Sequence, residues 1–214
     1  MNTPAAVPAQ AIKLHRFFLS GHSHRVELLL SLLRLPYVLV DVDLAAGAHK
    51  QPAFLAMNPF GQVPVMQDGE FTLADSNAIL VYLATQYDSG LWLPRDPIGA
   101  AAVQRWLSVA AGPLAFGPAT ARLATVFKAP VHAEEAIARA NDLFAVMDAE
   151  LKTAPFLTGN TPTIADIANY TYIAHAPEGN VSLDPYPHIR SWLQRIEALP
   201  GFVPMAKTKV GLAA

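Results

Sequence analysis

The chain has 214 residues, which is enough for one large domain or two small ones. It contains 15 Lys and Arg against 17 Asp and Glu, a formal net charge of −2 without a basic run, so we expect no nucleic-acid partner. The chain contains no Cys, which excludes a disulfide, a thiolate metal site and a catalytic thiol of its own.

The segment 1–10 holds Pro4 and Pro8 but neither a basic start nor an apolar core, so we expect a disordered leader rather than a signal peptide. Polar residues interrupt every apolar stretch before the roughly 18 residues that span a bilayer, so we expect no membrane contact and a cytoplasmic protein. The apolar pattern then predicts a strand over 12–17, a helix over 23–35 and a second strand over 37–43. This order is a βαβ unit, whose crossover is usually right-handed.

A hairpin is predicted at Asp68-Gly69, a dipeptide typical of a tight turn between two apolar runs. A loop over 44–52 and a short helical turn near 53–57 lead to it. Pro64 cannot donate to a sheet ladder, so it belongs at the start or the edge of a strand. If the bond between Val63 and Pro64 is cis, Val63 turns its N–H and C=O outward, where they can pair with an extended peptide. The alternative is that Pro64 merely starts a strand.

A helix is predicted from Ser76 to Tyr87, directly after Asp75. The free N–H groups and the positive dipole end of a helix start suit a carboxylate, and Asp75 would then be available to an ammonium group. The alternative is that Asp75 or Ser76 only caps the helix. Together with the exposed main chain at Val63, this helix start predicts a small acidic peptide as the ligand.

Beyond Tyr87 the chain is helical in pattern. We expect an α/β domain over 11–88, a linker over 89–97 and an all-helical domain over 98–214. The predicted helices of the second domain are one over 98–127 with bends at Gly112-Pro113 and Gly117-Pro118, one over 131–152, one opened by a capping box of Thr163 and Asp166, and one over 187–199.

The turn after the first strand reads Leu19-Ser20-Gly21-His22-Ser23-His24-Arg25 and should face the same cleft, because ligands bind beyond the carboxyl ends of parallel strands. A thiol that arrives with a ligand reacts as its thiolate, which a helix start and a hydroxyl donor stabilise. Ser20 is the candidate donor. A hydrogen bond to a charged group is worth about 1.5–3 kcal/mol, so removal of this hydroxyl should cost roughly 10- to 150-fold. The alternative is an ordinary N-cap at Ser20 or Ser23, and for Ser23 the cap is the better interpretation.

Three histidines, His22, His24 and His49, are candidates for metal ligands or for the partner of a serine nucleophile. No second carboxylate or thiolate accompanies them, so we expect solvent-facing imidazoles and no metal site. The G-x-S-x-G elbow of serine hydrolases is missing around Ser20, which excludes a Ser-His-Asp enzyme.

The run from His49 to Pro64, with its Asn-Pro-Phe-Gly-Gln-Val-Pro core, resembles the phi and theta groups of the cytosolic glutathione transferases. The similarity extends from Ile12 to Pro204 and includes the capping box at 163–166 and the last helix at 192–202. It implies an α/β plus all-α fold, in which a thioredoxin-like domain binds glutathione and an all-helical domain supplies most of the pocket for a second substrate. It implies no cofactor, with glutathione as a co-substrate.

By position, the resemblance makes Ser20 the activating hydroxyl and pairs both main-chain groups of Val63 with the cysteinyl backbone of glutathione. It assigns the γ-glutamyl end to Asp75 and Ser76, and the glycyl carboxylate to His49, Lys50 and Gln62. Asp75 replaces the Glu that is more usual there, which shortens the reach to the ammonium group but keeps the sign of the charge. A Phe placed like Phe60 enters the partner subunit in related groups, which implies a homodimer; the alternative is that Phe60 is a buried anchor.

We therefore expect an enzyme that ionises the thiol of glutathione and transfers it to an electrophilic small molecule. The alternatives are a glutathione- or ligand-binding protein with little turnover, and a specialised isomerase, dehalogenase or disulfide reductase. Phe116, Arg122 and Phe127 are candidates to line the electrophile pocket, although helical spacing more often indicates a core.

Overall fold

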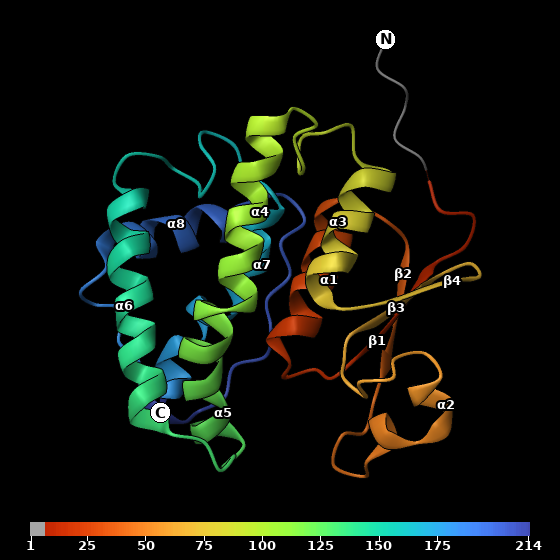
Figure 1. Cartoon of the computed structure of the whole chain (residues 1–214), viewed down its shortest axis with the longest axis horizontal. Helices are drawn as coiled ribbons and strands as arrows, with labels where there is room; N and C mark the ends of the chain where they lie inside the picture. Colours follow the sequence, from red (N-terminus) through yellow and green to blue (C-terminus); the bar gives the residue numbers. More distant parts are fainter. Residues whose placement is uncertain (1–6) are drawn as a thin grey trace.

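The computed structural model describes residues 7–214, and its strands form one four-stranded sheet (Figure 1). The strands are β1 (Ile12–Arg16), β2 (Tyr37–Asp41), β3 (Val65–Asp68) and β4 (Phe71–Ala74), in the order β2-β1-β3-β4. β1 runs parallel to β2 and antiparallel to β3, and β3 runs antiparallel to β4. This mixed sheet, with the helices that cover it, confirms the thioredoxin-like fold predicted for the first half.

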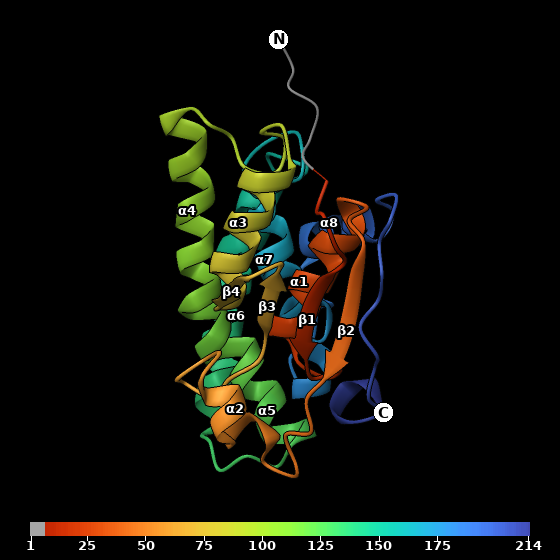
Figure 2. The ribbon, with the colours of Figure 1, turned by 90° about the vertical axis from the view of Figure 1, so that its right-hand side faces the viewer.

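Three helices accompany the sheet: α1 (Gly21–Leu32), α2 (Pro52–Leu55) and α3 (Ser76–Tyr87). α1 and α3 lie between the sheet and the helical half (Figure 1), and they bury side chains such as Leu29 and Ile79 there. α2 lies at one end of the sheet (Figure 2), where Phe54 packs with Val42 and Val65 in a small separate cluster. Val65 belongs to this small cluster, whereas the next residue, Met66, belongs to the main core, so both faces of β3 are covered.

The second half is helical, as predicted. Its helices are α4 (Pro97–Ala111), α5 (Thr120–Val126), α6 (Ala133–Leu151), α7 (Ile164–Ala174) and α8 (Pro187–Glu197). A π-helical segment, Ala115–Ala119, connects α4 and α5, and short 3-10 turns cover Ala48–Lys50, Ala176–Gly179 and Gly211–Ala213. The predicted helix over 98–127 bends at Gly112 and Gly117, both of which have non-helical backbone angles. Only Gly fits at 117 without a shift, because a Cβ would lie 3.1 Å from the backbone nitrogen of Ala140 in α6.

The helix predicted over 23–35 differs from α1 at both ends. α1 begins two residues earlier than predicted, because the Ser20 side chain accepts the N–H of Ser23 and caps the helix there. It ends at Leu32, because Arg34 adopts a left-handed φ of 55° that no helix continues through. The expected N-cap at Ser23 is therefore wrong, and this residue lies inside the first turn.

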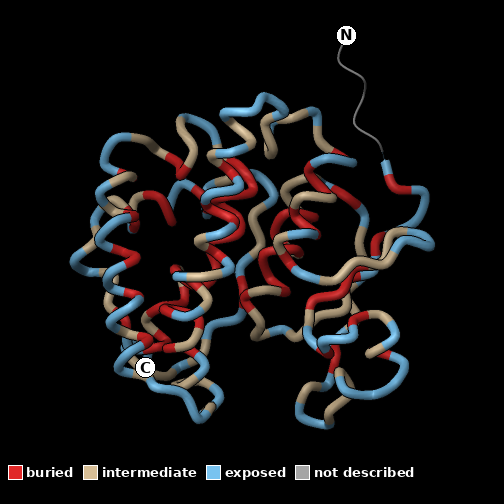
Figure 3. Tube along the Cα trace, viewed as in Figure 1, coloured by how far each residue is buried: buried red, intermediate tan, exposed pale blue. Residues whose placement is uncertain are grey.

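The two halves share one buried core, which Figure 3 shows as red segments along the helices that face each other. α7 packs against α1 and α4, and all residues from Ile164 to Ile173 are buried. The predicted capping box is confirmed, because Thr163 accepts the N–H of Ala165 while Asp166 accepts the N–H of Thr163 at 2.9 Å. Since α7 reaches both halves, its side chains approach the first turn of α1.

Residues 1–6 of the expected leader lie outside the described part of the chain, and residues 7–10 form neither a helix nor a strand. Within residues 7–214, no helix combines the length and the apolar character that a bilayer span requires. The same range holds no group of three or more His, Asp or Glu side chains placed to bind a metal ion.

Candidate functional site

The sheet brings three predicted segments to one edge. In the β ladder His15 of β1 lies opposite Val65 of β3, and Val65 lies opposite Ala74 of β4. The turn after β1, the residues just before β3 and the residues just after β4 therefore meet at the same end of the sheet. His22 Nδ1 lies 3.3 Å from Ser76 Oγ, which joins the starts of α1 and α3. The predicted residues Ser20, Val63, Asp75 and Ser76 belong to these segments.

Ser20 is the N-cap of α1 and is half-buried. Its Oγ accepts the N–H of Ser23 at 3.2 Å, whereas the Oγ of Ser23 accepts the N–H of Phe17 at 3.3 Å. Capping uses one lone pair of the Ser20 oxygen and leaves its proton free to donate. The two roles that the sequence offered for Ser20, helix cap and hydroxyl donor, are therefore compatible.

The bond between Val63 and Pro64 is cis. Neither the N–H nor the C=O of Val63 has a backbone partner within residues 7–214, although β3 begins only two residues later. The Val63 side chain is half-buried against the small cluster that includes Phe54. The main-chain N–H and C=O of Val63 thus form a short unpaired edge. An extended peptide can pair with such an edge as an additional strand of the sheet.

Asp75 is the N-cap of α3, and its Oδ1 accepts the N–H of Ala78 at 2.9 Å. Its φ of 72° is a left-handed value that residues other than Gly rarely adopt. Such a conformation costs about 1–3 kcal/mol and is concentrated at ligand sites. Ser76 follows as a buried first residue of α3, where the N–H groups of the first turn have no partner inside the helix. The exposed Asp75 carboxylate suits an ammonium group, and these N–H groups suit a carboxylate. Together they favour a ligand that carries both groups at one end.

Arg25 lies behind Ser76 and was missed by the sequence analysis. It is fully buried, and its Nη1 donates to Ser76 Oγ at 3.2 Å and to Asn77 Oδ1 at 2.9 Å. Its Nε and Nη2 have no partner, and it forms no ion pair, within residues 7–214. Burial lowers the pKa of Arg25 to about 10, so the group is still a cation at neutral pH. This cation adds to the dipole at the start of α3 and favours an anion there. A charged residue among the apolar positions of a predicted helix was the available signal.

The expectation of solvent-facing histidines is wrong. His24 is 3% exposed; its Nε2 donates to the Val203 carbonyl at 2.8 Å, and its Nδ1 accepts from the Thr171 hydroxyl at 2.9 Å. Burial lowers the pKa of His24 to about 4, and burial together with the charge of Arg25 lowers the pKa of His22 to about 3. Both imidazoles are therefore neutral at neutral pH and supply no positive charge to the site.

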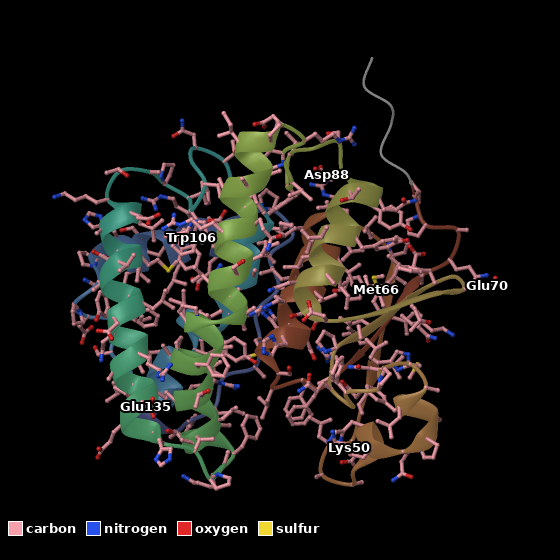
Figure 4. All side chains as sticks on the ribbon, viewed as in Figure 1. Lys50, Met66, Glu70, Asp88, Trp106 and Glu135 are labelled. Carbon is pink, nitrogen blue, oxygen red and sulfur yellow. The ribbon has the colours of Figure 1, made fainter. Side chains whose placement is uncertain are left out.

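The residues expected at the glycyl end of the ligand lie in the 3-10 turn and in the loop 58–62. Figure 4 shows Lys50 beside α2, and its Nζ donates to two carbonyl oxygens of that loop, at 3.0 and 3.2 Å. Buried Asn58 fixes the same loop, because its Nδ2 donates to the carbonyl of Gln62 at 2.7 Å. His49 Nδ1 is buried and has no hydrogen-bond partner within residues 7–214. The turn and the loop are thus held together, and one ring nitrogen of His49 stays unpaired within residues 7–214.

Arg122 was a candidate to line the electrophile pocket, but it is buried in an ion pair instead. Its Nε donates to Glu178 Oε2 at 2.7 Å and its Nη1 donates to the carbonyl of Leu19 at 2.8 Å. The side chains of Arg122 and Glu178 are only 2% and 3% exposed. Burial by itself would raise the pKa of Glu178, but hydrogen bonds from neighbouring donors outweigh it and lower the pKa to about 2. This ion pair of the helical half therefore fixes the residue that precedes Ser20.

Aromatic rings border the turn that carries Ser20. The Phe17 ring lies 5.0 Å from that of Phe18 and 6.1 Å from that of Phe127, measured between centroids. Phe18 and Phe127 are 49% and 39% exposed, so they form an apolar rim beside this turn. Phe116, the third pocket candidate, lies elsewhere. It lines a hollow of about 560 Å³ beside the start of α6, together with Thr120, Pro130, Val131, Ala136 and Arg139.

Comparisons with known proteins agree with this geometry. Two family models match, the N-terminal domain of glutathione S-transferase over residues 19–86 and its C-terminal domain over residues 115–200. Glutathione S-transferase 3 of Zea mays is 34% identical over 207 residues, which cover 89% of this chain and 91% of that protein. Disulfide-bond oxidoreductase YfcG of Escherichia coli is 30% identical over 84% of this chain and 87% of that protein. A crystal structure of glutathione S-transferase from Pseudomonas fluorescens superposes with a TM-score of 0.87 at 32% identity, covering 92% of this chain and 100% of that one.

The two matching models fall on the sheet half and on the helical half, and the plant relative spans most of both. Similarity to a plant transferase agrees with the phi-like character of the run from His49 to Pro64. The chain belongs to the cytosolic glutathione S-transferase family.

Proposed function

We propose that this glutathione transferase holds glutathione along the sheet edge, stabilises its thiolate through Ser20 and transfers the sulfur to an electrophilic small molecule. The observation that carries the proposal is the meeting of Ser20, the unpaired main chain of Val63 and the start of α3 at one end of the sheet. Glutathione would pair with Val63 as an added strand. Its γ-glutamyl carboxylate would meet the first N–H groups of α3, and its ammonium group would meet Asp75.

The glycyl carboxylate then reaches the turn of His49 and Lys50 and the nearby Gln62. Support comes from the Lys50 ammonium, which is fixed at the loop 58–62, and from the buried His49 Nδ1, which lacks a partner within residues 7–214. An ammonium cation and an unpaired ring nitrogen on adjacent residues suit a terminal carboxylate. All three charged groups of glutathione thereby obtain partners of opposite sign or a hydrogen-bond donor.

The chemistry begins with ionisation of the thiol. Its proton leaves to water, because a serine hydroxyl is far too weak a base to take it, and the Ser20 O–H donates a hydrogen bond to the sulfur anion. The positive end of α1 favours the same anion. A sulfur lone pair then forms a bond to the electrophilic carbon, and the leaving group departs with its bonding pair or, in an addition, the adduct takes a proton from water. The aromatic rim of Phe18 and Phe127 suits an apolar electrophile.

Replacement of Ser20 by alanine should lower kcat/KM for glutathione and an aryl halide by roughly 10- to 150-fold, because one hydrogen bond to a charged sulfur is lost. The rise in melting temperature at millimolar glutathione should remain, since the other contacts are kept. Ser31→Ala is the matched control on the same helix, because its hydroxyl donates to the Gly201 carbonyl at 2.6 Å, in the C-terminal part of the chain. That variant should keep parental kinetics.

Parental kinetics in Ser20→Ala would refute the role of its hydroxyl. An unchanged melting transition of the parent at millimolar glutathione would overturn the whole assignment of the cleft. If glutathione raises the melting temperature of the parent but no aryl halide is converted, the protein is a glutathione-binding protein with little turnover.

A second candidate function is the reduction of disulfides, which is favoured by the relative named disulfide-bond oxidoreductase. The chain contains no Cys, so both sulfurs of the oxidised product must come from glutathione. The bound thiolate attacks a substrate disulfide and one sulfur leaves as a thiolate; a second glutathione then displaces the other, giving oxidised glutathione. Assays of a small disulfide and of an aryl halide under the same conditions separate the two functions.

We also propose a homodimer in which Phe60 of one protomer enters the other. Phe60 is 80% exposed, although the loop that carries it is fixed by Asn58 and Lys50. The hollow of about 560 Å³ beside α6 is lined in part by apolar side chains, including that of Phe116, and is large enough for a phenyl ring. Aromatic side chains are enriched among interface hot spots, where each fills a pocket of the partner.

Phe60→Ser should raise the dimer dissociation constant at least about 30-fold, the size of an interface hot spot. Sedimentation across a concentration series measures it. Phe116→Ser, at the rim of the hollow, should act in the same direction. Ile98→Ser is the control, because it removes an equally exposed apolar side chain, 84% exposed, at the start of α4. A parent that is monomeric at all concentrations, or a Phe60→Ser variant that dimerises like the parent, would contradict the proposal.

A further inference from the structure

The buried cation of the site, Arg25 of α1, has no acidic partner. Its side chain is fully buried, and no ion pair within residues 7–214 includes it. Its Nε and Nη2 also lack a hydrogen-bond partner in this range. The ring centroid of Tyr172 lies 5.9 Å from its Cζ, which compensates the charge only in part. A buried charge without a partner destabilises the ligand-free protein, so an anion that arrives with a ligand would be favoured beside it.

The hydrogen bonds of Arg25 direct its charge to the start of α3. α1 and α3 lie side by side (Figure 1), and Nη1 of Arg25 donates to Ser76 Oγ at 3.2 Å and to Asn77 Oδ1 at 2.9 Å. The amide of Asn77 is fixed in this orientation, because its Nδ2 donates to the carbonyl of Leu107 in α4 at 3.1 Å. The guanidinium is thereby held one hydroxyl away from any group that Ser76 binds.

Asp75 precedes this pair in the chain and does not neutralise Arg25. Its carboxylate is exposed, accepts the N–H of Ala78 and forms no ion pair within residues 7–214. Burial lowers the pKa of Arg25 to about 10, while interactions with Tyr172 and Asp75 oppose this lowering, so the guanidinium is charged at neutral pH. The start of α3 therefore combines a buried cation with an exposed carboxylate. An amino-acid end whose carboxylate points inward and whose ammonium group points outward would match both charges.

We infer that Arg25 is a positioning residue that acts through Ser76 on the α-carboxylate of the γ-glutamyl end of glutathione, and that its charge makes the site select ligands with a carboxylate there. The inference rests on the proposed function. The Ser76 hydroxyl and the first N–H groups of α3 would contact the carboxylate, and Arg25 would lie behind them.

The size of the expected effect follows from burial and distance. Salt screens buried charges much less than exposed ones. Two unit charges two hydrogen-bond lengths apart, at the effective dielectric constant found for protein sites, attract strongly enough to raise a binding constant by roughly 10- to 100-fold. This is the share of glutathione affinity that we assign to Arg25.

The test compares three ligands by titration calorimetry on the full-length protein. They are glutathione, 4-aminobutyryl-Cys-Gly, which lacks only the α-carboxylate, and glutathione amide, which lacks only the charge of the glycyl carboxylate. Arg25→Gln should weaken the binding of glutathione and of its amide by roughly 10- to 100-fold and that of 4-aminobutyryl-Cys-Gly less than about threefold. A merely structural role of Arg25 would weaken all three ligands by the same factor, which would overturn the inference.

Arg16→Gln is the matched control, because it removes a cation that already has acidic partners. Arg16 lies 2.5 Å from Glu27 and 3.0 Å from Asp41, measured between the closest charged atoms. Its charge is therefore compensated inside the protein, and the variant should bind all three ligands like the parent. A loss for glutathione equal to that of Arg25→Gln would contradict a specific role of the unpaired cation.

Asn77→Asp keeps the test decisive should Arg25→Gln fold poorly. It has nearly the same shape, keeps an acceptor for Nη1 of Arg25 and supplies the acidic partner that this cation lacks. Because the charge of Arg25 is then compensated, glutathione should bind roughly 10- to 100-fold more weakly, whereas 4-aminobutyryl-Cys-Gly should not lose affinity. Parental affinity for glutathione in this variant would contradict the inference.

The parent protein separates this inference from the proposed function. If the parent binds glutathione and 4-aminobutyryl-Cys-Gly equally well, the α-carboxylate does not lie at the start of α3, and the proposed placement of glutathione fails. If the parent prefers glutathione and Arg25→Gln keeps the same preference, only the inference on Arg25 is overturned.

Discussion

Replacement of Arg122 by methionine should lower the free energy of unfolding by about 3–5 kcal/mol, the range found when one partner of a buried ion pair is removed. Arg122 and Glu178 are 2% and 3% exposed, and Nε of Arg122 lies 2.7 Å from Oε2 of Glu178. The variant leaves the Glu178 carboxylate buried without its cation and the Leu19 carbonyl without its donor. Denaturant unfolding at neutral pH measures the loss.

The effect should depend on pH in a defined direction. The pKa of Glu178 is lowered from 4.5 to about 2, so the stabilisation is fully present above pH 4.5 and is lost as the pH falls through 2. In Arg122→Met the buried carboxylate takes up a proton more readily, and the penalty of burying it disappears in acid. The stabilities of parent and variant should therefore converge as the pH falls below 4.5.

An exposed ion pair provides the control. Arg105 and Glu150 are 56% and 38% exposed and their closest atoms lie 2.5 Å apart, so Arg105→Met should cost only about 0–1 kcal/mol. The double variant Arg122→Met/Glu178→Gln should recover part of the loss, because no unpaired charge remains buried. Equal stability of Arg122→Met and Arg105→Met at neutral pH would show that the buried pair contributes no more than a surface pair.

Asp166→Ala should lower the free energy of unfolding by at least about 3 kcal/mol, because three buried donors lose their acceptor together at about 1–3 kcal/mol each. The Asp166 carboxylate accepts from the Leu157 N–H at 2.9 Å, the Thr163 N–H at 2.9 Å and the Trp192 Nε1–H at 2.8 Å. Asp166 thereby joins the start of α7 to α8 and to the segment around Leu157 that precedes α7. For a chain of this size the melting temperature should fall by roughly 6–12 °C.

Asp96→Ala separates this effect from ordinary helix capping. Asp96 is also an N-cap and accepts the N–H groups of Ile98 and Gly99, but it is exposed, so water replaces it. Its loss should cost about 1 kcal/mol. If the melting temperature falls no further in Asp166→Ala than in Asp96→Ala, the buried donors find other partners.

Local patterns predicted much of the sheet half. α3 runs from Ser76 to Tyr87 as predicted, because an N-cap and an apolar period act within a few residues. The hairpin predicted at Asp68-Gly69 is present and pairs β3 with β4, but Asp68 still pairs with Phe71, so the two turn residues are Gly69 and Glu70. The segments of Ser20 and Val63 were identified in the same way, from a helix start and from a proline at a strand start.

Predictions failed where distant segments decide the environment. His24 was expected in solvent, but its hydrogen-bond partners Thr171 and Val203 lie 147 and 179 positions away in the chain. Arg122 was considered for a pocket wall, but Glu178 and the Leu19 carbonyl enclose it. Both residues lie in helices that the apolar period predicted. The residues that pack against them could not be identified from the sequence.

The sequence by itself determined the order of strands and helices and the turn that holds Ser20, because caps, turns and apolar periods are properties of neighbouring residues. The family and the thioredoxin-like fold were recognised differently, from the resemblance of the run between His49 and Pro64 to known glutathione transferases. Only the tertiary structure decided that α7 lies against α1, that Arg25 is a buried cation behind Ser76, and that Tyr172 reaches the first turn of α1. The physical reason is that burial and hydrogen-bond partnership depend on which surfaces pack together, and no spacing within one helix records the helix that will cover it.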